Sequence, residues 1–369
     1  MKVLISGYYG FGNVGDEAVL EAIVLGLARH DPAPAVTVLS ATPRLTAEFY
    51  KVKAFPRFRF FALWRALRQT DVLLSGGGTL FQDATSRRSL WYYLFVIVLA
   101  KLARKKVMVF AQGFGPLRRP LNRWLAKLVL NRVDLITLRD DDSLAELEKC
   151  GIRRPPRFVT ADPTALLELR SQGEGRRVLA LEGVIFDRPL VGVAIRSVPH
   201  EPATEERVFQ VLAENLDHLS QNHGLQPVFL LFQCPEDLKQ ANRVIALMER
   251  KSNIIFRICR PDEMLALFPS FALVIGMRLH ALIFAALNTV PLLGLAYDPK
   301  VKAFMAAIGQ PCLDLGEVEK MNGLVDQVAA ASANIRRDLA RQRDRLKEAA
   351  AKNFTLFFEK FSGNGRSGA

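Results

Sequence analysis

The stretch Phe271-Ala-Leu-Val-Ile-Gly-Met-Arg278-Leu-His280-Ala-Leu-Ile-Phe-Ala-Ala286 reads as an apolar strand that passes through Gly276 into an apolar helix. A strand that is apolar throughout and leads directly into a helix is typical of a buried parallel sheet. Arg278 and His280 stand at the turn between the two elements. The first amides of a helix lack intrahelical partners and carry partial positive charge, so we predict that this turn binds an anion.

Arg278 and His280 suggest a reaction at this turn as well as binding. A guanidinium grips phosphate or carboxylate through two parallel hydrogen bonds, and an imidazole gives or takes a proton near neutral pH. The alternative is that Arg278 caps the strand end and that His280 is an ordinary buried histidine. Because the two residues lie together, we favour a site that binds an anion and transfers a proton.

Alternating apolar strands and helical stretches set the fold class. Strands are expected at 2–6, 36–40, 72–75, 107–111 and 135–138, and the alternation restarts at 190–195 after a charged, Gly-containing segment. We predict an α/β protein with two doubly wound, Rossmann-like domains that face a cleft. The predicted boundaries are 1–170 for the first domain, 171–189 for a linker, 190–316 for the second domain, and 317–369 for a C-terminal helical segment that packs across both domains and ends in a frayed tail.

Composition argues against several classes of protein. The four cysteines lie far apart without metal-ligand spacing, so we expect neither a metal site nor a disulfide framework. The longest apolar segment, 90–100, is shorter than the roughly 20 residues that a membrane-spanning helix needs. The N-terminus lacks the features of a signal peptide, and we expect a cytoplasmic protein.

Positive charge is concentrated in one region. The net charge is +13, and residues 51–132 hold 17 Lys or Arg against Asp71 and Asp83, a local net charge of +15. The stretch 56–68 alternates arginines with aromatic residues. Such a region predicts an anionic partner, with an anionic membrane surface and nucleic acid as candidates. The alternative is that ordinary amphipathic helices bury these aromatics and leave the arginines in solvent.

Glycine-rich turns follow three predicted strands of the first domain. They read Gly7-Tyr-Tyr-Gly-Phe-Gly-Asn13-Val-Gly15-Asp16-Glu17, Gly76-Gly77-Gly78-Thr-Leu-Phe-Gln82-Asp83 and Gln112-Gly113-Phe-Gly-Pro116. Glycine lets the backbone approach a ligand closely, while amides and carboxylates suit hydroxyl groups better than phosphates. We assign hydroxyl-binding roles to Asn13, Gly15, Asp16, Gln82 and Asp83, with Gly77, Gly78 and Gly113 as further candidates. The alternative for Asp16 is a helix N-cap.

Cations follow two more strands of the second domain. Arg196 comes directly after 190–195, and Tyr297 and Lys300 come after the final strand. Together with Arg278, Arg196 would hold the two ends of a small polyanion. Tyr297 and Lys300 are further candidates, as a proton carrier and a cation.

These motifs resemble the polysaccharide pyruvyl transferases, above all the bacterial branch that pyruvylates the cell-wall glycan anchoring surface-layer proteins. The resemblance rests on Gly12-Asn-Val-Gly-Asp-Glu17, the Gly76–Asp83 motif, Gly113-Phe-Gly-Pro116, Met277-Arg-Leu-His-Ala281 and Tyr297-Asp-Pro-Lys-Val301, in this order. It implies an enzyme that transfers pyruvate from phosphoenolpyruvate, as co-substrate and without a further cofactor, to two hydroxyls of one sugar. It also implies an architecture similar to that of the B-type glycosyltransferases. Carried over, Arg278 and Leu279 match the donor motif, Arg196 matches less specifically, and His280 is the catalytic residue.

The resemblance also implies partners and a location. The acceptor would be a lipid-linked amino-sugar glycan used in cell-wall biogenesis. The basic region would then face the anionic inner surface of the plasma membrane, with the enzyme bound peripherally and without nucleic acid. Two alternative functions stay open: a nucleotide-sugar glycosyltransferase of the same architecture and a non-enzymatic polyanion-binding protein. The sequence does not specify the oligomeric state.

Overall fold

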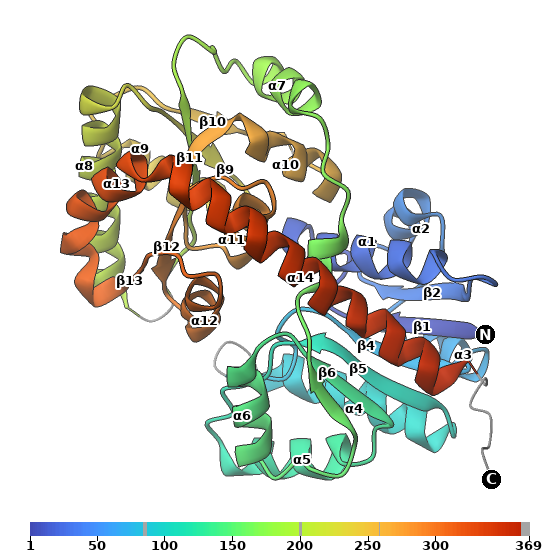
Figure 1. Cartoon of the computed structure of the whole chain (residues 1–369). Coiled ribbons are helices and arrows are strands. Elements are labelled where there is room, and N and C mark those ends of the chain that lie inside the picture. The colour runs from blue at the N-terminus through green and yellow to red at the C-terminus, as the bar shows by residue number, and fades with distance from the viewer. Residues whose placement is uncertain (84–86, 199–200, 258, 363–369) are drawn as a thin grey trace. The chain divides into compact units, whose positions relative to one another are not determined.

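Strands alternate with helices along the chain, as Figure 1 shows for a computed structural model that describes residues 1–83, 87–198, 201–257 and 259–362. The chain divides into two units. Unit 1 comprises Met1–Phe11, Asp16–Leu167 and Leu346–Ala369, and unit 2 comprises Gly12–Gly15 and Glu168–Arg345. Each unit holds one sheet in which all the described strand pairs are parallel, which confirms the predicted α/β fold class.

The sheet of unit 1 has the strand order β3-β2-β1-β4-β5-β6-β7. The order reverses at β1, which pairs with β2 on one side and with β4 on the other. The loops that follow β1 and β4 therefore diverge and leave a crevice at their carboxyl ends. The strands are β1 (Lys2–Ser6), β2 (Ala35–Ser40), β3 (Lys53–Pro56), β4 (Val72–Gly76), β5 (Lys106–Gln112), β6 (Leu135–Leu138) and β7 (Arg157–Val159).

Helices cover both faces of this sheet. On one face, Leu73 of the sheet shares a core with Leu67 of α3, Ile97 of α4 and Ala126 of α5. On the other face, the strand residues next to Leu73 share a core with Ile23 of α1 and with residues of α14. Because successive strand side chains point to opposite faces, these are two separate layers. The helices are α1 (Val14–Ala28), α2 (Pro43–Tyr50), α3 (Phe60–Arg68), α4 (Arg87–Leu102), α5 (Pro120–Leu130), α6 (Asp141–Lys149) and the short η1 (Pro163–Leu166).

Among the elements of unit 1 that the sequence-based prediction did not include are α2 and β3. β3 is the edge strand, and its residues are exposed or only partly buried. An edge strand needs no continuous apolar run, so the hydrophobic pattern that identified its neighbours gave no signal here.

Arg57 corrects the interpretation of 56–68 as a solvent-facing basic stretch. Its guanidinium is buried and lies 4.5 to 5.4 Å from the ring centroids of Phe11, Phe58, Tyr92 and Tyr93. It also donates hydrogen bonds to the carbonyl of Gly7 at 2.7 Å and to the Tyr93 hydroxyl at 3.1 Å. Aromatic faces and these acceptors stabilise the buried charge. Arg57 is therefore a core residue that anchors the loop after β1.

The sheet of unit 2 has the order β10-β9-β8-β11-β12-β13 and reverses at β8, between β9 and β11. Its strands are β8 (Leu190–Ala194), β9 (Gln226–Leu230), β10 (Asn253–Ile255), β11 (Phe271–Gly276), β12 (Leu292–Ala296) and β13 (Cys312–Asp314). Its helices are α7 (Gln172–Leu181), α8 (Pro202–Asn222), α9 (Glu236–Ile245), α10 (Pro261–Leu267), η2 (Phe268–Ser270), α11 (Leu279–Leu287), α12 (Pro299–Ala307), η3 (Leu315–Lys320) and α13 (Met321–Ala330).

The segment predicted as a linker, 171–189, contains helix α7 and belongs to unit 2, whose main segment begins at Glu168. Ser171 caps the helix by accepting a hydrogen bond from the amide of Glu174. A Cβ at Gly175 would lie 1.8 Å from the Ala266 carbonyl oxygen, so this glycine lets α7 pack closely on α10. Gly175, one of the glycines that suggested a linker, thus serves helix packing.

The C-terminal helix α14 (Ser332–Phe361) is shared between the units. Its residues up to Arg345 belong to unit 2, and those from Leu346 onward belong to unit 1. In unit 1 Phe354 and Phe357 enter the core, and buried Asn353 accepts a hydrogen bond from the Thr160 hydroxyl at 2.9 Å. The predicted frayed tail, 363–369, lies outside the described residues. Among the helices that are described, none is both long and apolar enough to cross a membrane.

Candidate active site

Arg278 occupies the N-cap position of α11, directly after β11. Its Nε donates to Asp237 Oδ2 at 3.1 Å and its Nη2 donates to Asp237 Oδ1, so the carboxylate grips the guanidinium at two points. Asp237 lies in the first turn of α9 and also accepts the amides of Phe232 and Gln233, both at 3.0 Å. Four hydrogen bonds therefore fix this buried carboxylate, and the carboxylate in turn fixes the plane of the Arg278 guanidinium.

This ion pair refines the interpretation of Arg278 as a cation for a ligand. Both partners are buried, and a buried charge needs such compensation. Asp237 engages Nε and Nη2, while Nη1 faces the Gln233 side chain at 3.5 Å. Arg278 is thus an oriented group, whose remaining N–H bonds have a fixed direction. The sequence analysis missed Asp237, because an acidic residue in the first turn of a helix is ordinary there.

His280 lies in the first turn of α11 and adjoins the Gly12–Gly15 segment of unit 2. A Cβ on Gly15 would lie 2.1 Å from His280 Nδ1, so only a glycine leaves room for the imidazole in this position. Beside it the side-chain amide of Asn13 donates to Gln233 Oε1 at 3.4 Å, and the backbone amide of Val14 donates to the Phe232 carbonyl at 2.8 Å. The sequence analysis grouped Asn13 and Gly15 with the first domain, whereas the structure places them in unit 2 with His280.

A second group of predicted residues gathers after β8 and β12 of the same sheet. Arg196 Nη1 donates to the Tyr297 hydroxyl at 2.9 Å, and its guanidinium lies 4.5 Å from the ring centroid. Lys300 Nζ lies 5.6 Å from the same centroid and 3.4 Å from Asp298, the N-cap of α12. β8, β11 and β12 are neighbours, so their carboxyl ends bring Arg196, Arg278 and Lys300 to one edge of unit 2.

These cations act on Tyr297. Burial alone would raise the pKa of its phenol, but the positive charges of Lys300, Arg196 and Arg278 outweigh burial and lower that pKa below its ordinary value. Any other anion that enters this edge experiences the same field. The edge is therefore suited to a small, multiply charged anion.

The predicted glycines of unit 1 have packing roles. Gly77 and Gly78 both have positive φ, and a Cβ on Gly77 would lie 1.9 Å from Val19 of α1. Buried Gln112 donates to their carbonyls at 2.5 and 3.2 Å. A Cβ on Gly78 would lie 2.9 Å from Asp16 Oδ1, which places the Asp16 carboxylate beside this turn. Their ligand-binding roles stay predictions.

Arg139, which follows β6, lies under Gly113. A Cβ on Gly113 would lie 2.7 Å from Arg139 Nη2, and the same nitrogen donates to the Thr79 hydroxyl at 2.9 Å. The guanidinium also lies 3.4 Å from Asp140 and 3.8 Å from Asp162. This buried network ties the loops after β4, β5 and β6 together.

Gln82 and Asp83 follow Phe81, which forms an isolated bridge with Phe114. The carboxylate of Asp83 accepts the amides of Arg118 and Arg119 at 2.8 and 3.1 Å and the Asn122 side chain at 2.8 Å. Burial raises the pKa of Asp83, but these hydrogen bonds outweigh it and lower the pKa below the ordinary value. Asp83 therefore caps the start of α5, a role that the sequence analysis did not foresee.

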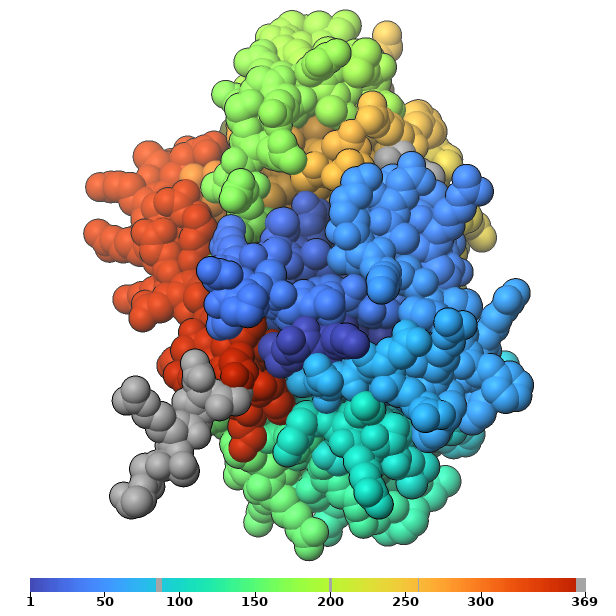
Figure 2. Space-filling model, turned by 90° about the vertical axis from the view of Figure 1, so that its right-hand side faces the viewer, coloured from blue at the N-terminus to red at the C-terminus, as the bar shows by residue number. Residues whose placement is uncertain are grey.

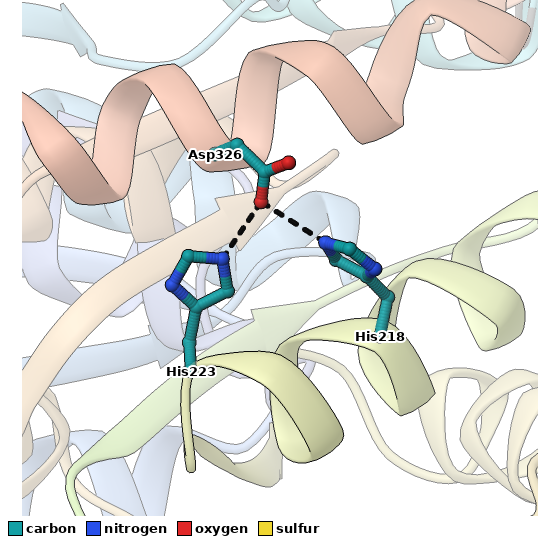
Figure 3. Close-up of side chains that lie close together, drawn as sticks. All are labelled: His218, His223 and Asp326. Carbon is teal, nitrogen blue, oxygen red and sulfur yellow. Dashed lines mark hydrogen bonds and ion pairs between the residues drawn. The ribbon is translucent and has the colours of Figure 1, made fainter.

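Figure 3 shows the one group of potential metal ligands found in the described residues, His218, His223 and Asp326. Both imidazoles turn Nε2 toward the same Asp326 oxygen, at 3.0 and 2.7 Å. The side chain of Asn222 lies 2.8 Å from Nδ1 of His218. These contacts join the end of α8 to α13 as a hydrogen-bonded triad within unit 2.

Comparison with known proteins assigns the chain to a family. A family model described as polysaccharide pyruvyl transferase matches residues 13–299, a range that includes Asn13, Arg196, Arg278 and His280 and ends one residue before Lys300. The chain belongs to the polysaccharide pyruvyl transferase family. The amylovoran biosynthesis protein AmsJ of Erwinia amylovora is 20% identical over 405 residues, which cover 93% of this chain and 96% of AmsJ. Family membership supports a pyruvyltransferase that acts on polysaccharide.

Solved structures extend the likeness to the fold. Anabaena HepE in complex with UDP is similar with a TM-score of 0.66 at 14% identity, over 98% of this chain and 100% of HepE. A UDP-GlcNAc 2-epimerase from Neisseria meningitidis reaches 0.66 at 13% identity, over 99% of this chain and 100% of the epimerase. The pyruvyl transferase chain thus has the B-type architecture of glycosyltransferases and epimerases. At these identities the likeness concerns the fold alone.

Proposed function

We propose that this family member transfers the pyruvyl group of phosphoenolpyruvate to two hydroxyls of one sugar in a polysaccharide precursor and releases phosphate. The observation that carries the proposal is the convergence of Arg196, Arg278 and Lys300 on one edge of unit 2, with His280 in the turn that Arg278 begins. A multiply charged donor requires several cations, and protonation of an enol phosphate requires an acid.

The donor carries a carboxylate and a phosphate, whose combined negative charge needs more than one cation. Arg278, oriented by Asp237, and the start of α11 at Leu279 would bind one end, while Arg196 and Lys300 would bind the other. Binding the donor near Tyr297 brings negative charge toward the phenol, which raises the pKa that the cations had lowered. Tyr297 thereby stays protonated and can donate a hydrogen bond to the bound anion.

His280 would supply the proton. Protonation of the methylene carbon of the enol creates an oxocarbenium-like centre, and the first sugar hydroxyl attacks it. Phosphate leaves with the bonding electrons, and the second hydroxyl closes the cyclic ketal. Each hydroxyl loses its proton as its C–O bond forms; one of these protons returns to His280, and the other leaves with the phosphate. The cations that bind the phosphate end of the donor would stabilise the negative charge that develops on it as it leaves.

For the acceptor we propose the carboxyl edge of unit 1, where Asp16 and Gln82 offer groups that bind hydroxyls. The capping hydrogen bonds of Asp83 give this residue an indirect role, since it fixes the chain beside Gln82. Asn13, which lies in unit 2 near His280, would instead contact the reacting hydroxyl. A lipid-linked amino-sugar glycan at the inner face of the plasma membrane is the acceptor that the family resemblance favours.

Calorimetric titration of the full chain with phosphoenolpyruvate and with UDP tests the proposal. Arg278→Lys is the main variant, because it keeps the positive charge but loses the two-point grip, whereas an alanine would leave Asp237 buried without its partner. We expect phosphoenolpyruvate to bind the wild type and to bind Arg278→Lys and Arg196→Ala about tenfold or more weakly. The control Arg250→Ala removes an exposed cation elsewhere in unit 2 and should change nothing. Binding of UDP without phosphoenolpyruvate would identify a nucleotide-sugar enzyme instead.

A further inference from the structure

Three neighbouring helices of unit 1, α3, α4 and α5, form one layer on the sheet. α4 contacts both α3 and α5, and the inner side chains of all three belong to one core. The indole of Trp91 on α4 donates to Asn122 on α5 at 2.9 Å, which joins these two helices at the surface. Figure 2 shows the light-blue and teal atoms of this part of unit 1 next to one another on the face turned to the viewer.

The outer side of α4 is apolar as well as its inner side. Trp91, Phe95, Val98 and Leu102 are exposed and follow one another at intervals of four, three and four residues, so they form a single stripe along the helix. The outer side of a helix on a globular protein is ordinarily polar. Leu102 keeps 69% of its surface in solvent, which costs free energy unless another apolar phase covers it.

The adjoining helices continue this surface. On α5 Leu121, Trp124 and Leu128 are exposed at intervals of three and four residues, which also makes a stripe. At the start of α3 Phe60 is exposed and Phe61 is 85% exposed. We call these three sets together the α3–α5 outer surface. An exposed apolar area of this kind on a soluble fold marks a binding surface.

The charged residues on the three helices of the α3–α5 outer surface are all basic. α3, α4 and α5 are 9, 16 and 11 residues long and contain no Asp or Glu. Exposed cations lie among the apolar stripes at Arg65, Arg68, Arg88, Arg123 and Lys127. The N-cap positions of α3 and α5 are also arginines, Arg59 and Arg119, where an acidic residue would suit the helix dipole. Two acids in the adjoining loops are engaged, Asp83 in capping α5 and Asp134 in an ion pair with Lys101.

We infer that the α3–α5 outer surface binds reversibly to an anionic phospholipid bilayer. The guanidinium and ammonium groups pair with headgroup phosphates, while Trp, Phe and Leu side chains enter the boundary between headgroups and acyl chains. Tryptophan favours that boundary because its ring is apolar and its N–H is polar. Nucleic acid offers phosphates but no apolar phase for Val98, Leu102, Leu121 and Leu128. A second copy of this chain would bring the same positive charge against the surface.

Intrinsic fluorescence reports on this binding without a label. The chain has three tryptophans, Trp64, Trp91 and Trp124, and all three lie on these helices. Vesicles of phosphatidylcholine mixed with phosphatidylglycerol should shift the emission to shorter wavelength and carry the full chain into the pellet on centrifugation. Vesicles of phosphatidylcholine alone should do neither, and added salt should weaken the binding.

Variants separate the two contributions. Phe61→Ser, Phe95→Ser and Leu102→Ser together should weaken binding about tenfold or more, as should Arg65→Glu with Arg123→Glu. The control set Leu181→Ser, Ile185→Ser and Phe256→Ser removes exposed apolar side chains from unit 2 and should bind as the wild type does. Circular dichroism checks that each variant is folded. No binding to the anionic vesicles at low salt, or equal binding by the apolar triple variant, overturns the inference. So does a self-association that the triple variant abolishes, or preference for an oligonucleotide over the vesicles. None of these readouts uses pyruvyl transfer.

Discussion

Replacing Gly15 by alanine tests the position of His280 with the smallest possible change. The new Cβ would lie 2.1 Å from Nδ1 and 2.6 Å from Cγ of the imidazole. Ordinary contacts begin near 3.4 Å, so the ring must retreat by more than 1 Å. Overpacking costs about 1–3 kcal/mol, and the better helix propensity of alanine returns about 0.5–1 kcal/mol. Because the net loss is small beside the stability of a domain of this size, the variant should fold.

Catalysis should suffer far more than stability. A displacement of about 1 Å at a reacting group costs about 10²-fold in rate, so we expect phosphate release from phosphoenolpyruvate in the presence of acceptor to fall about a hundredfold. Gly323→Ala is the matched control, since Gly323 lies in helix α13 and a Cβ there would meet nothing within 4 Å. That variant should turn over normally and melt slightly higher. A folded Gly15→Ala enzyme with wild-type turnover would refute the placement of His280 at the reaction centre.

Three further results follow from the contacts of single side chains. Asp237→Asn should weaken phosphoenolpyruvate binding in calorimetry, because its amide no longer holds Arg278 in one orientation; unchanged affinity would mean that this orientation is unimportant. Absorbance titration at 295 nm should find the Tyr297 phenol ionising below its ordinary 10.0, and Lys300→Met should move it upward. Because the pKa of Tyr297 is lower in the folded than in the unfolded protein, its ionisation adds stability as the pH rises through the folded pKa. The gain is complete only above the unfolded pKa of about 10. Asp83→Asn should cost about 1 kcal/mol of stability near neutral pH, through the lost cap of α5. The lowered pKa of Asp83 means that this difference from the wild type should shrink as the solution is made acidic, and a difference independent of pH would contradict the capping role.

The elements with continuous apolar runs were predicted well. The strand expected at 271–275 and the helix expected at 280–287 correspond to β11 (Phe271–Gly276) and α11 (Leu279–Leu287). Such runs are legible because both faces of a central parallel strand are buried. The sequence-based prediction missed β3 because the two faces of an edge strand need not both be buried. Segment 171–189 was misread because Gly175 suggests flexibility in the sequence, whereas its role is the close packing of α7 on α10.

The location of the candidate site could be predicted in part from the strand ends. Arg278 and His280 stand beside a strand end, and the chain topology alone brings strand ends together. Asp237 is 41 residues from Arg278 along the chain, and no local pattern links the two. Arg57 was misplaced because burial of a cation depends on aromatic rings from three separate segments. Partners that meet only in the tertiary structure carry no periodic signal.

The division of helix α14 between the two units has a consequence for biosynthesis. When the ribosome has made residues 1–167, the nascent chain holds every strand of the first sheet but lacks Phe354 and Phe357 from its core. The Thr160 hydroxyl also lacks its hydrogen-bond acceptor Asn353, which is 193 residues further along the chain. Unit 2 can complete most of its sheet before the final turns of α14 emerge. The part of the protein that is synthesised first is therefore finished last, and a chain truncated at residue 345 should leave unit 1 loosely packed and open to proteases.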